Sequence, residues 1–302
     1  MRFDWYQATV EAEPLAVINM LSKLGDKVVR ADNAAKRWRY RQGFEVLSNS
    51  TGHAAYIFID NNGDMRPHVL ASSDQTDALV DVVRQEWPES HLVTRMDSAE
   101  DFIDSSAYDR LRKVTRKVAK QHGLKFPKYE DDLNPSAGRT QYIGGPTSDY
   151  RGRLYEKGRE QANKCLAGLD LVSMGLHNVE VMTVWNQQLQ KDVKTDEWTR
   201  LELQIRPKGE EARRAAAVAT PEQAWTFSNW TSQLASEAMA IDLERFYIRT
   251  KKISKDDEAL LWMCHQYGGL LTRFRDDLGD WKAVGMQVGE LISKINSEKE
   301  KK

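Results

Sequence analysis

Apolar and polar residues alternate along several short segments of the chain, and this period of two predicts β-strands with one apolar and one polar face. The strands predicted in this way cover residues 2–10, 54–60, 66–72, 91–101, 139–143, 151–157, 178–185 and 198–206. The second and third are joined by the turn-forming sequence Asn-Asn-Gly-Asp at 61–64. We therefore expect these two strands to form an antiparallel hairpin.

Other segments place apolar residues three or four positions apart, which is the spacing of one face of a helix. Helices are predicted over 14–24, 74–87 and 108–121, and over most of the chain after Pro221. The first begins at Pro14 and is followed by Gly25, and the second stops before Pro88. These are the expected places for proline and glycine at helix ends.

The order of these elements predicts an α+β fold in which a central antiparallel sheet has helices on one face. A stretch rich in Gly, Pro and Asp separates two halves whose elements follow a similar order, although no clear sequence repeat relates them. We expect the N-terminal half of the sheet domain at 1–122, a connector at 123–138, the C-terminal half at 139–220, a helical C-terminal region at 221–297 and a disordered Lys-rich tail at 298–302.

The composition narrows the classes of function. The 302 residues are 40% hydrophobic and 29% charged with a formal net charge of −1, so contact with nucleic acid would need a local concentration of positive charge. The two cysteines, Cys165 and Cys264, have no CxxC spacing, which excludes a cysteine zinc finger and a disulfide scaffold and favours a reducing cytoplasm. We expect no signal peptide and no membrane span.

Four of the predicted strands carry charged or phenolic residues on the face opposite their apolar residues. In the two later strands these are Arg151, Arg153, Tyr155 and Lys157, and Arg200, Glu202, Gln204 and Arg206. In the two earlier strands they are Arg95, Asp97 and Asp101, and Asp4 and Tyr6. Phe3 and Trp5 are expected on the opposite, apolar face of the first strand.

If these strands belong to one sheet, their polar faces combine into a surface suited to phosphodiester chemistry. Carboxylates are hard oxygen ligands for Mg²⁺ or Mn²⁺, and Arg and Lys stabilise the charge of a phosphate. Tyr155 is a candidate nucleophile, but a phenol with an ordinary pKa of about 10 needs a neighbouring metal ion or a cation such as Lys157. The alternative interpretation is a solvated face without chemistry.

At these positions the sequence resembles the replication initiation factor family of rolling-circle plasmids, filamentous phages and related mobile-element relaxases. The similarity lies in Asp-Trp at 4–5, Thr-Arg-Met-Asp-Ser-Ala-Glu-Asp at 94–101, Gln-Tyr-Ile-Gly-Gly at 141–145, Arg-Leu-Tyr-Glu-Lys at 153–157, Trp-Thr-Arg-Leu-Glu-Leu at 198–203 and Tyr-Gly-Gly-Leu-Leu at 267–271. These motifs follow one another across almost the whole chain. The sequence departs from the family at Glu156, where Asp or Asn is more usual.

The resemblance implies a metal-dependent nicking and closing enzyme that starts rolling-circle replication and forms a 5′-phosphotyrosine intermediate. Tyr155 corresponds to the nicking tyrosine, and Arg153 and Lys157 are its expected catalytic cations. The carboxylates expected to bind Mg²⁺ or Mn²⁺ are Asp4, Asp97, Asp101 and Glu202. The implied partners are origin DNA and a host helicase and polymerase, in a bacterial cytoplasm, and a homodimer stays open.

Positive charge is also concentrated in the helix predicted over 108–121, which we expect to contact the DNA backbone. Of its six cations, the expected DNA contacts are Arg112, Lys113, Arg116, Lys117 and Lys120, and the strands add Arg95, Arg200 and Arg206. A solvated helix face is the competing interpretation of the same charges.

Three alternatives stay open from the sequence. Tyr142 and Tyr150 are rival nucleophiles close to Tyr155. A relaxase that acts in transfer would use the same chemistry, whereas a protein that binds an origin or promoter without cutting it would not need a nucleophile. The histidines form no H-x-H pair, so metal binding is expected to depend on carboxylates.

Overall fold

The computed structural model describes residues 1–49, 52–60, 65–130, 138–166, 182–187, 189–241 and 255–299. Contacts divide the chain into two units, Met1–Arg249 and Thr250–Lys302. In its described part, the second unit consists of α9 (Lys255–Leu278) and α10 (Trp281–Lys299), which contact each other. Among the described residues, no helix combines the length and the apolar character that crossing a membrane requires.

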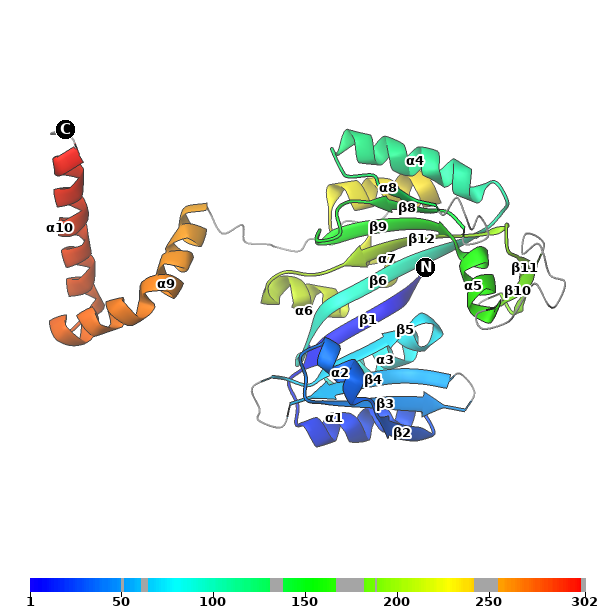
Figure 1. The fold of residues 1–302 in the computed structure, drawn as a ribbon, viewed down its shortest axis with the longest axis horizontal. Helices are drawn as coiled ribbons and strands as arrows, with labels where there is room; N and C mark the ends of the chain where they lie inside the picture. The colour runs from blue at the N-terminus through cyan, green and yellow to red at the C-terminus, as the bar shows by residue number, and fades with distance from the viewer. Residues whose placement is uncertain are drawn as a thin grey trace. The chain divides into compact units, whose positions relative to one another are not determined.

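An antiparallel sheet, ten-stranded over the described residues, forms the centre of the first unit (Figure 1). The strands lie side by side in the order β2 (Lys27–Arg30), β3 (Gln42–Ser48), β4 (Gly52–Ile59), β5 (His68–Ser72), β1 (Arg2–Val10), β6 (His91–Ile103), β12 (Trp198–Ile205), β9 (Tyr150–Glu156), β8 (Thr140–Ile143) and β7 (Lys128–Tyr129). A separate two-stranded sheet pairs β10 (Thr183–Asn186) with β11 (Lys191–Lys194). The predicted α+β fold with a central antiparallel sheet and a helical C-terminal region is confirmed.

One face of the large sheet packs against helices and encloses the main hydrophobic core. The helices on this core face are α1 (Pro14–Leu21), α3 (Thr76–Glu86), α4 (Ala107–Gln121), α6 (Glu210–Val218), α7 (Pro221–Ala224) and α8 (Asn229–Met239). Leu154, Leu201 and Leu203 supply the sheet side of this core. The helices α7 and α8 lie within the region expected at 221–297, yet they pack in the first unit.

The opposite face of the sheet, called the polar face below, carries two further helices. The short helix α2 (Asp32–Arg37) packs over β3, and its Ala35 belongs to a small buried cluster with Tyr40 and with Phe58 of β4. The helix α5 (Lys157–Leu166) packs with β10 and β11 over Trp198 of β12. Single-turn 3₁₀ helices, η1 (Ser22–Leu24) and η2 (Ser73–Gln75), complete the described elements. Between α2 and α5 lies the part of the polar face that carries the predicted site.

The strand β1 departs from the predicted alternation. Its pairing with β6 shifts between Phe3 and Trp5, which leaves Asp4 as an additional residue in the strand. Such a bulge places two consecutive side chains on one side of the sheet. Trp5 therefore joins Asp4 on the polar face, whereas Tyr6 joins Phe3 in the main core. The predicted placement of Tyr6 with Asp4, and of Trp5 opposite, is wrong for this reason.

Some predicted features lie outside the described residues. These are the turn at 61–64, residues 131–137 of the connector expected at 123–138, residues 178–181 of the strand expected at 178–185 and the end of the tail at 300–302. The strands on either side of the turn pair in antiparallel fashion, as the hairpin prediction requires.

Candidate active site

The register of three central strands brings the predicted site residues together. Arg200 on β12 lies opposite Asp101 on β6 and opposite Tyr155 on β9. Two residues further along β12, Glu202 lies opposite Arg153. Alternate residues of a strand share a face, so these side chains converge on the polar face, while Leu154, Leu201 and Leu203 point into the core.

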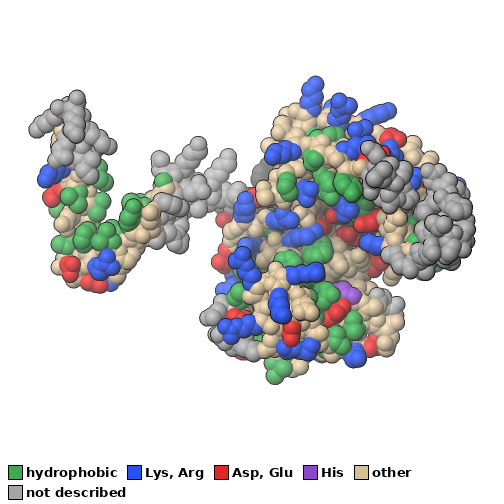
Figure 2. Space-filling view, viewed as in Figure 1, with side chains coloured by type: hydrophobic (Ala, Val, Ile, Leu, Met, Phe, Trp, Pro, Cys, Tyr) green, Lys and Arg blue, Asp and Glu red, His purple; other side chains and the backbone are tan. Residues whose placement is uncertain are grey.

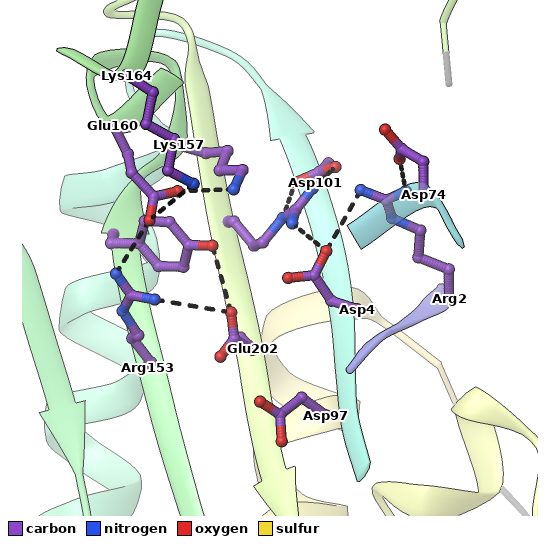
Figure 3. Close-up of polar contacts among 12 residues, drawn as sticks. Arg2, Asp4, Asp74, Asp97, Asp101, Arg153, Lys157, Glu160, Lys164 and Glu202 are labelled. Atoms are coloured by element: carbon purple, nitrogen blue, oxygen red, sulfur yellow. Dashed lines mark hydrogen bonds and ion pairs between the residues drawn. The ribbon is translucent and has the colours of Figure 1, made fainter. Parts of the chain in front are cut away.

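Tyr155 lies among charged groups. Figure 3 shows three of them, Arg153, Lys157 and Glu202, which come from neighbouring elements and point toward one another. The hydroxyl of Tyr155 donates a hydrogen bond of 3.2 Å to Oε2 of Glu202. The guanidinium of Arg153 lies 3.8 Å from the centre of its ring, and Nζ of Lys157 lies 5.6 Å from it. Burial, followed by the charge of Glu202, raises the pKa of Tyr155 well above its usual value. The phenol is therefore protonated at neutral pH, and a base must accept its proton when it attacks.

Two buried carboxylates lie at the centre of the site. Burial, and then the charges of Asp97 and Asp4, raise the pKa of Glu202 to about 7. Burial also raises the pKa of Asp97, although Arg95 opposes the shift through two hydrogen bonds to this carboxylate. An acceptor whose pKa is near neutrality suits proton transfer at physiological pH. Glu202 therefore has both the contact and the basicity to accept the phenol proton.

Arg200 is an internal cation that organises the carboxylates beside it. It is fully buried, donates two hydrogen bonds of 2.7 Å to the two oxygens of Asp101, and donates another of 2.6 Å to Asp4. Both oxygens of Asp101 thus accept from Arg200. In this structure Arg200 and Asp101 pair with each other, and the roles expected for them, contact with the DNA backbone and metal binding, stay predictions.

Glu160 is a site residue that the sequence analysis missed. Its carboxylate accepts a hydrogen bond of 2.6 Å from Lys157 and forms an ion pair of 3.5 Å with Arg153. Burial, followed by repulsion from Arg200, lowers the pKa of Lys157 from its usual value. The spacing of Lys157 and Glu160 on α5 is the i,i+3 spacing at which helix side chains meet. That spacing was the available signal, but the sequence analysis assigned Lys157 to a strand.

The donor set has the chemistry that a divalent cation prefers, since carboxylate oxygens suit Mg²⁺ and Mn²⁺. The mutual repulsion of Asp4, Asp97 and Glu202 also marks a place where added positive charge would be stabilising. However, in the described part of the chain no three carboxylate, His or Cys side chains are placed to hold an ion between them. Bound metal would need further ligands, and the metal set stays a prediction.

Two cavities open beside these residues. One of about 180 Å³ is lined by the cations Arg2, Lys157 and Arg200, by two tryptophans, and by Asp74 and several uncharged polar side chains. The other, of about 150 Å³, is lined by Arg95, Tyr142, Arg151, Arg153, Glu202 and Gln204. Figure 2 shows acidic side chains in a recess over the middle of the first unit, with Lys and Arg side chains around it. A phosphate that enters either cavity meets cations next to the site of Tyr155.

The rival tyrosines occupy different environments. Tyr142 lies on the polar face opposite Arg153, with the guanidinium of Arg151 at 4.0 Å from its ring centre. Tyr150 packs against the main core. The geometry therefore leaves Tyr142 as the rival of Tyr155 and separates Tyr150 from the site.

The basic helix predicted over 108–121 forms as α4, but it lies on the core face of the sheet. Lys113, Arg116, Lys117 and Lys120 are exposed there, and Lys117 pairs with Glu237 of α8. Arg112 donates to Gln141, and Arg206 donates to the carbonyl of Pro146. The structure does not bring the α4 cations together with Tyr155, because the sheet lies between them.

No protein-family model and no curated protein matches the chain. A solved structure described as the rolling circle replication initiator protein from Geobacillus stearothermophilus is similar to it, with 17% sequence identity and a TM-score of 0.43. The match covers 81% of this chain and 98% of that chain.

Proposed function

We propose that this protein cuts and rejoins one DNA strand through Tyr155 and acts as the initiator of rolling-circle replication. The observation that supports the proposal most directly is the hydrogen bond of the Tyr155 hydroxyl to Glu202, next to Arg153 and Lys157. A nucleophile, a proton acceptor and phosphate-binding cations are the groups that transesterification at a phosphodiester requires.

In the proposed reaction, Oη of Tyr155 attacks the phosphorus and the bond from phosphorus to the 3′ oxygen breaks. The phenol proton passes to Oε2 of Glu202, and the 3′ oxygen leaves as a hydroxyl after taking a proton from water. The 5′ phosphate remains on the tyrosine. Arg153 and Lys157 stabilise the charge that develops on the phosphate oxygens. Reversal of these steps rejoins the strand.

The phosphate must reach a phenol that is 2% exposed. The side chain of Arg153 covers its ring and is itself 31% exposed. We infer that Arg153 turns from the ring toward the phosphate when DNA binds, since an anion competes with the ring for the guanidinium. This motion would uncover Tyr155 and place the cation on the reacting group in one step.

Mg²⁺ or Mn²⁺ is proposed as the cofactor. Asp97, Glu202 and Asp4 would contribute oxygen ligands only after a rearrangement on DNA binding, because no three such side chains of the described residues are now placed to hold an ion between them. The ion would supply positive charge to the scissile phosphate. Asp101 is the weakest of the four expected ligands, because Arg200 engages both of its oxygens.

The test uses supercoiled DNA that carries fragments from the region around the gene for this chain, with and without Mg²⁺ or Mn²⁺. We expect open circles and a denaturant-resistant protein–DNA adduct, with the modified peptide containing Tyr155. Tyr155→Phe should abolish the adduct, and Glu202→Gln should slow its formation by about 10²- to 10⁴-fold.

Tyr150→Phe is the matched control, because this tyrosine belongs to the same strand but packs against the core. An undiminished adduct in Tyr155→Phe would remove Tyr155 as the nucleophile and direct attention to Tyr142. Retardation of the DNA without any cutting by the wild-type protein would favour a binding protein without this activity. A relaxase of conjugative transfer would give the same adduct and differs in the DNA site at which it forms.

A further inference from the structure

The polar face continues beyond the charged residues into an aromatic cavity. This cavity has a volume of about 310 Å³ and is lined by Trp5, Arg37, Trp38, Tyr56, Phe58 and Leu70, with Ala34 at its wall. The volume falls at the lower end of the range of roughly 300–1,000 Å³ that is usual for small-ligand sites. The lining residues belong to β1, β4, β5 and α2, except Trp38, which follows α2 directly. The cavity therefore lies on the half of the sheet that does not carry Tyr155.

The rings of the cavity are arranged as a stack. Trp38 lies 6.3 Å from Phe58 with an angle of 23° between the ring planes, and Phe58 lies 5.8 Å from Tyr56 with an angle of 17°. Rings this close to parallel can accept another flat ring with the same orientation. Trp38 is 37% exposed, so its indole is accessible at the surface rather than closed inside a core.

Positive charge follows the aromatic residues along the chain. Arg37 lines the cavity, and Arg39 is exposed on the other side of Trp38 in the sequence. Arg39 occupies the left-handed region with φ 65°, at the end of α2, where Tyr40 donates its backbone N–H to the carbonyl of Ala35. Glycine is the usual residue at such a position. The chain has an arginine there despite the conformational cost.

The aromatic cavity is connected to the charged site through Arg95. Its guanidinium lies 4.3 Å from the ring centre of Trp5, which lines the aromatic cavity, and bonds the carboxylate of Asp97. Arg95 also lines the cavity that contains Arg153 and Glu202. A ligand can therefore extend over the polar face from the stacked rings to the neighbourhood of Tyr155, with cations along its path.

We propose that this aromatic cavity binds one unpaired base of the single-stranded DNA whose phosphate reaches Tyr155. The inference rests on the proposed function for the identity of the polymer. Stacked rings recognise the flat face of a base. Arg37 in the lining of the cavity and Arg95 over Trp5 would contact the phosphates next to that base. Because every base has such a face, the cavity would bind a nucleotide at a fixed place with little preference for its sequence.

The test compares two fluorescent probes in the absence of divalent ions, a short oligothymidylate and an abasic oligomer of the same length. They carry the same phosphates and differ in the bases. We expect the wild-type protein to bind the oligothymidylate about tenfold more tightly, the effect expected of one stacked base. Trp38→Ala should remove this difference, Trp38→Phe should keep most of it, and Tyr129→Ala, at an exposed ring on the edge strand β7, should leave it unchanged.

Equal binding of the two probes by the wild-type protein, or an undiminished difference in Trp38→Ala, would overturn the proposal. A measurement without any variant covers the case in which Trp38→Ala unfolds. Photocross-linking of an oligomer that contains 5-iododeoxyuridine should label Trp5, Trp38 or Tyr56. Labelling confined to other residues would contradict the proposal that this cavity binds a base. If no adduct forms at Tyr155 but the base-dependent binding persists, the proposed cutting activity fails and the base site stands.

Discussion

The two halves of the polar face satisfy their buried side chains in different ways. Around β6, β12 and β9, charged groups pair with one another, as Arg200 does with Asp101 and Asp4. Around β4, β5 and α2, flat rings stack, and the buried polar ring among them, His68, is surrounded by aromatic neighbours. The charged half can accept a proton from a reacting group and stabilise negative charge, whereas the aromatic half can bind a flat ring. One continuous surface thus combines a half suited to catalysis with a half suited to binding.

The largest expected effect on stability comes from replacing Arg200, the central cation of the charged half. Arg200→Met removes the cation that bonds both oxygens of the part-buried Asp101 and leaves Asp4 with Arg2 alone, which should lower the free energy of unfolding by about 3–5 kcal/mol. Denaturant unfolding of the two proteins measures the difference. Arg110→Met is the matched control, because Arg110 and its partner Asp104 are both exposed and such pairs contribute about 1 kcal/mol or less. A similar small loss in Arg200→Met would show that the ion pairs do not organise this half.

The aromatic half should respond to pH through His68. Burial lowers the pKa of His68 to about 4, so between pH 6.5 and 4 the unfolded chain takes up a proton that the folded chain does not. The folded state therefore loses stability as the pH falls through this window, by about 3 kcal/mol at its lower end. This stability is fully present above pH 6.5.

The measurement is the free energy of unfolding of the wild-type protein and of His68→Phe at a series of pH values. The difference between the two proteins should change by the stated amount across the window, because the variant has no group to protonate there. His122→Phe, at an exposed histidine on the core-face side, should follow the wild-type curve. Parallel curves for wild type and His68→Phe would contradict a neutral, buried His68.

The smallest effect concerns the strained residue beside the aromatic cavity. Arg39→Gly relieves a left-handed conformation and should raise the free energy of unfolding by about 1 kcal/mol. Arg39→Ala keeps the strain and should give no such gain. If the aromatic half is a binding surface, Arg39→Gly should at the same time weaken binding of the oligothymidylate. A more stable protein with unchanged binding would confine Arg39 to a structural role.

The charged half could be predicted from the sequence because its strands are regular where the site lies. In β6, β9 and β12, strict alternation placed Asp97, Tyr155 and Glu202 on one face, and the register then brought them together. The same rule failed in β1, because the bulge at Asp4 depends on pairing with β6 and leaves no mark in a single strand. The sequence also did not predict which face of the sheet α4 covers, because that face is determined by how the apolar residues of α4 pack against the sheet.

The aromatic half could not be predicted, for a physical reason. Its rings come from separate elements, and α2, which precedes Trp38, is short and begins without a side-chain cap. The sequence analysis assigned no element to residues 32–38, which contain this helix and Trp38. The cavity exists because β4, β5 and β1 pair beside that helix, and pairing over such separations is not encoded in any local pattern.

The strand β1 contributes Asp4 to one half of the polar face and Trp5 to the other, as neighbours in the chain. Main-chain hydrogen bonds to β5 and β6 fix this strand in the middle of the sheet. The spacing between the base cavity and the nucleophile is thus a property of the backbone, independent of the DNA sequence. In a protein that works as proposed, this spacing is a molecular ruler: the cut falls a constant number of nucleotides from the base that is held, and moving either end of the ruler would move the cut.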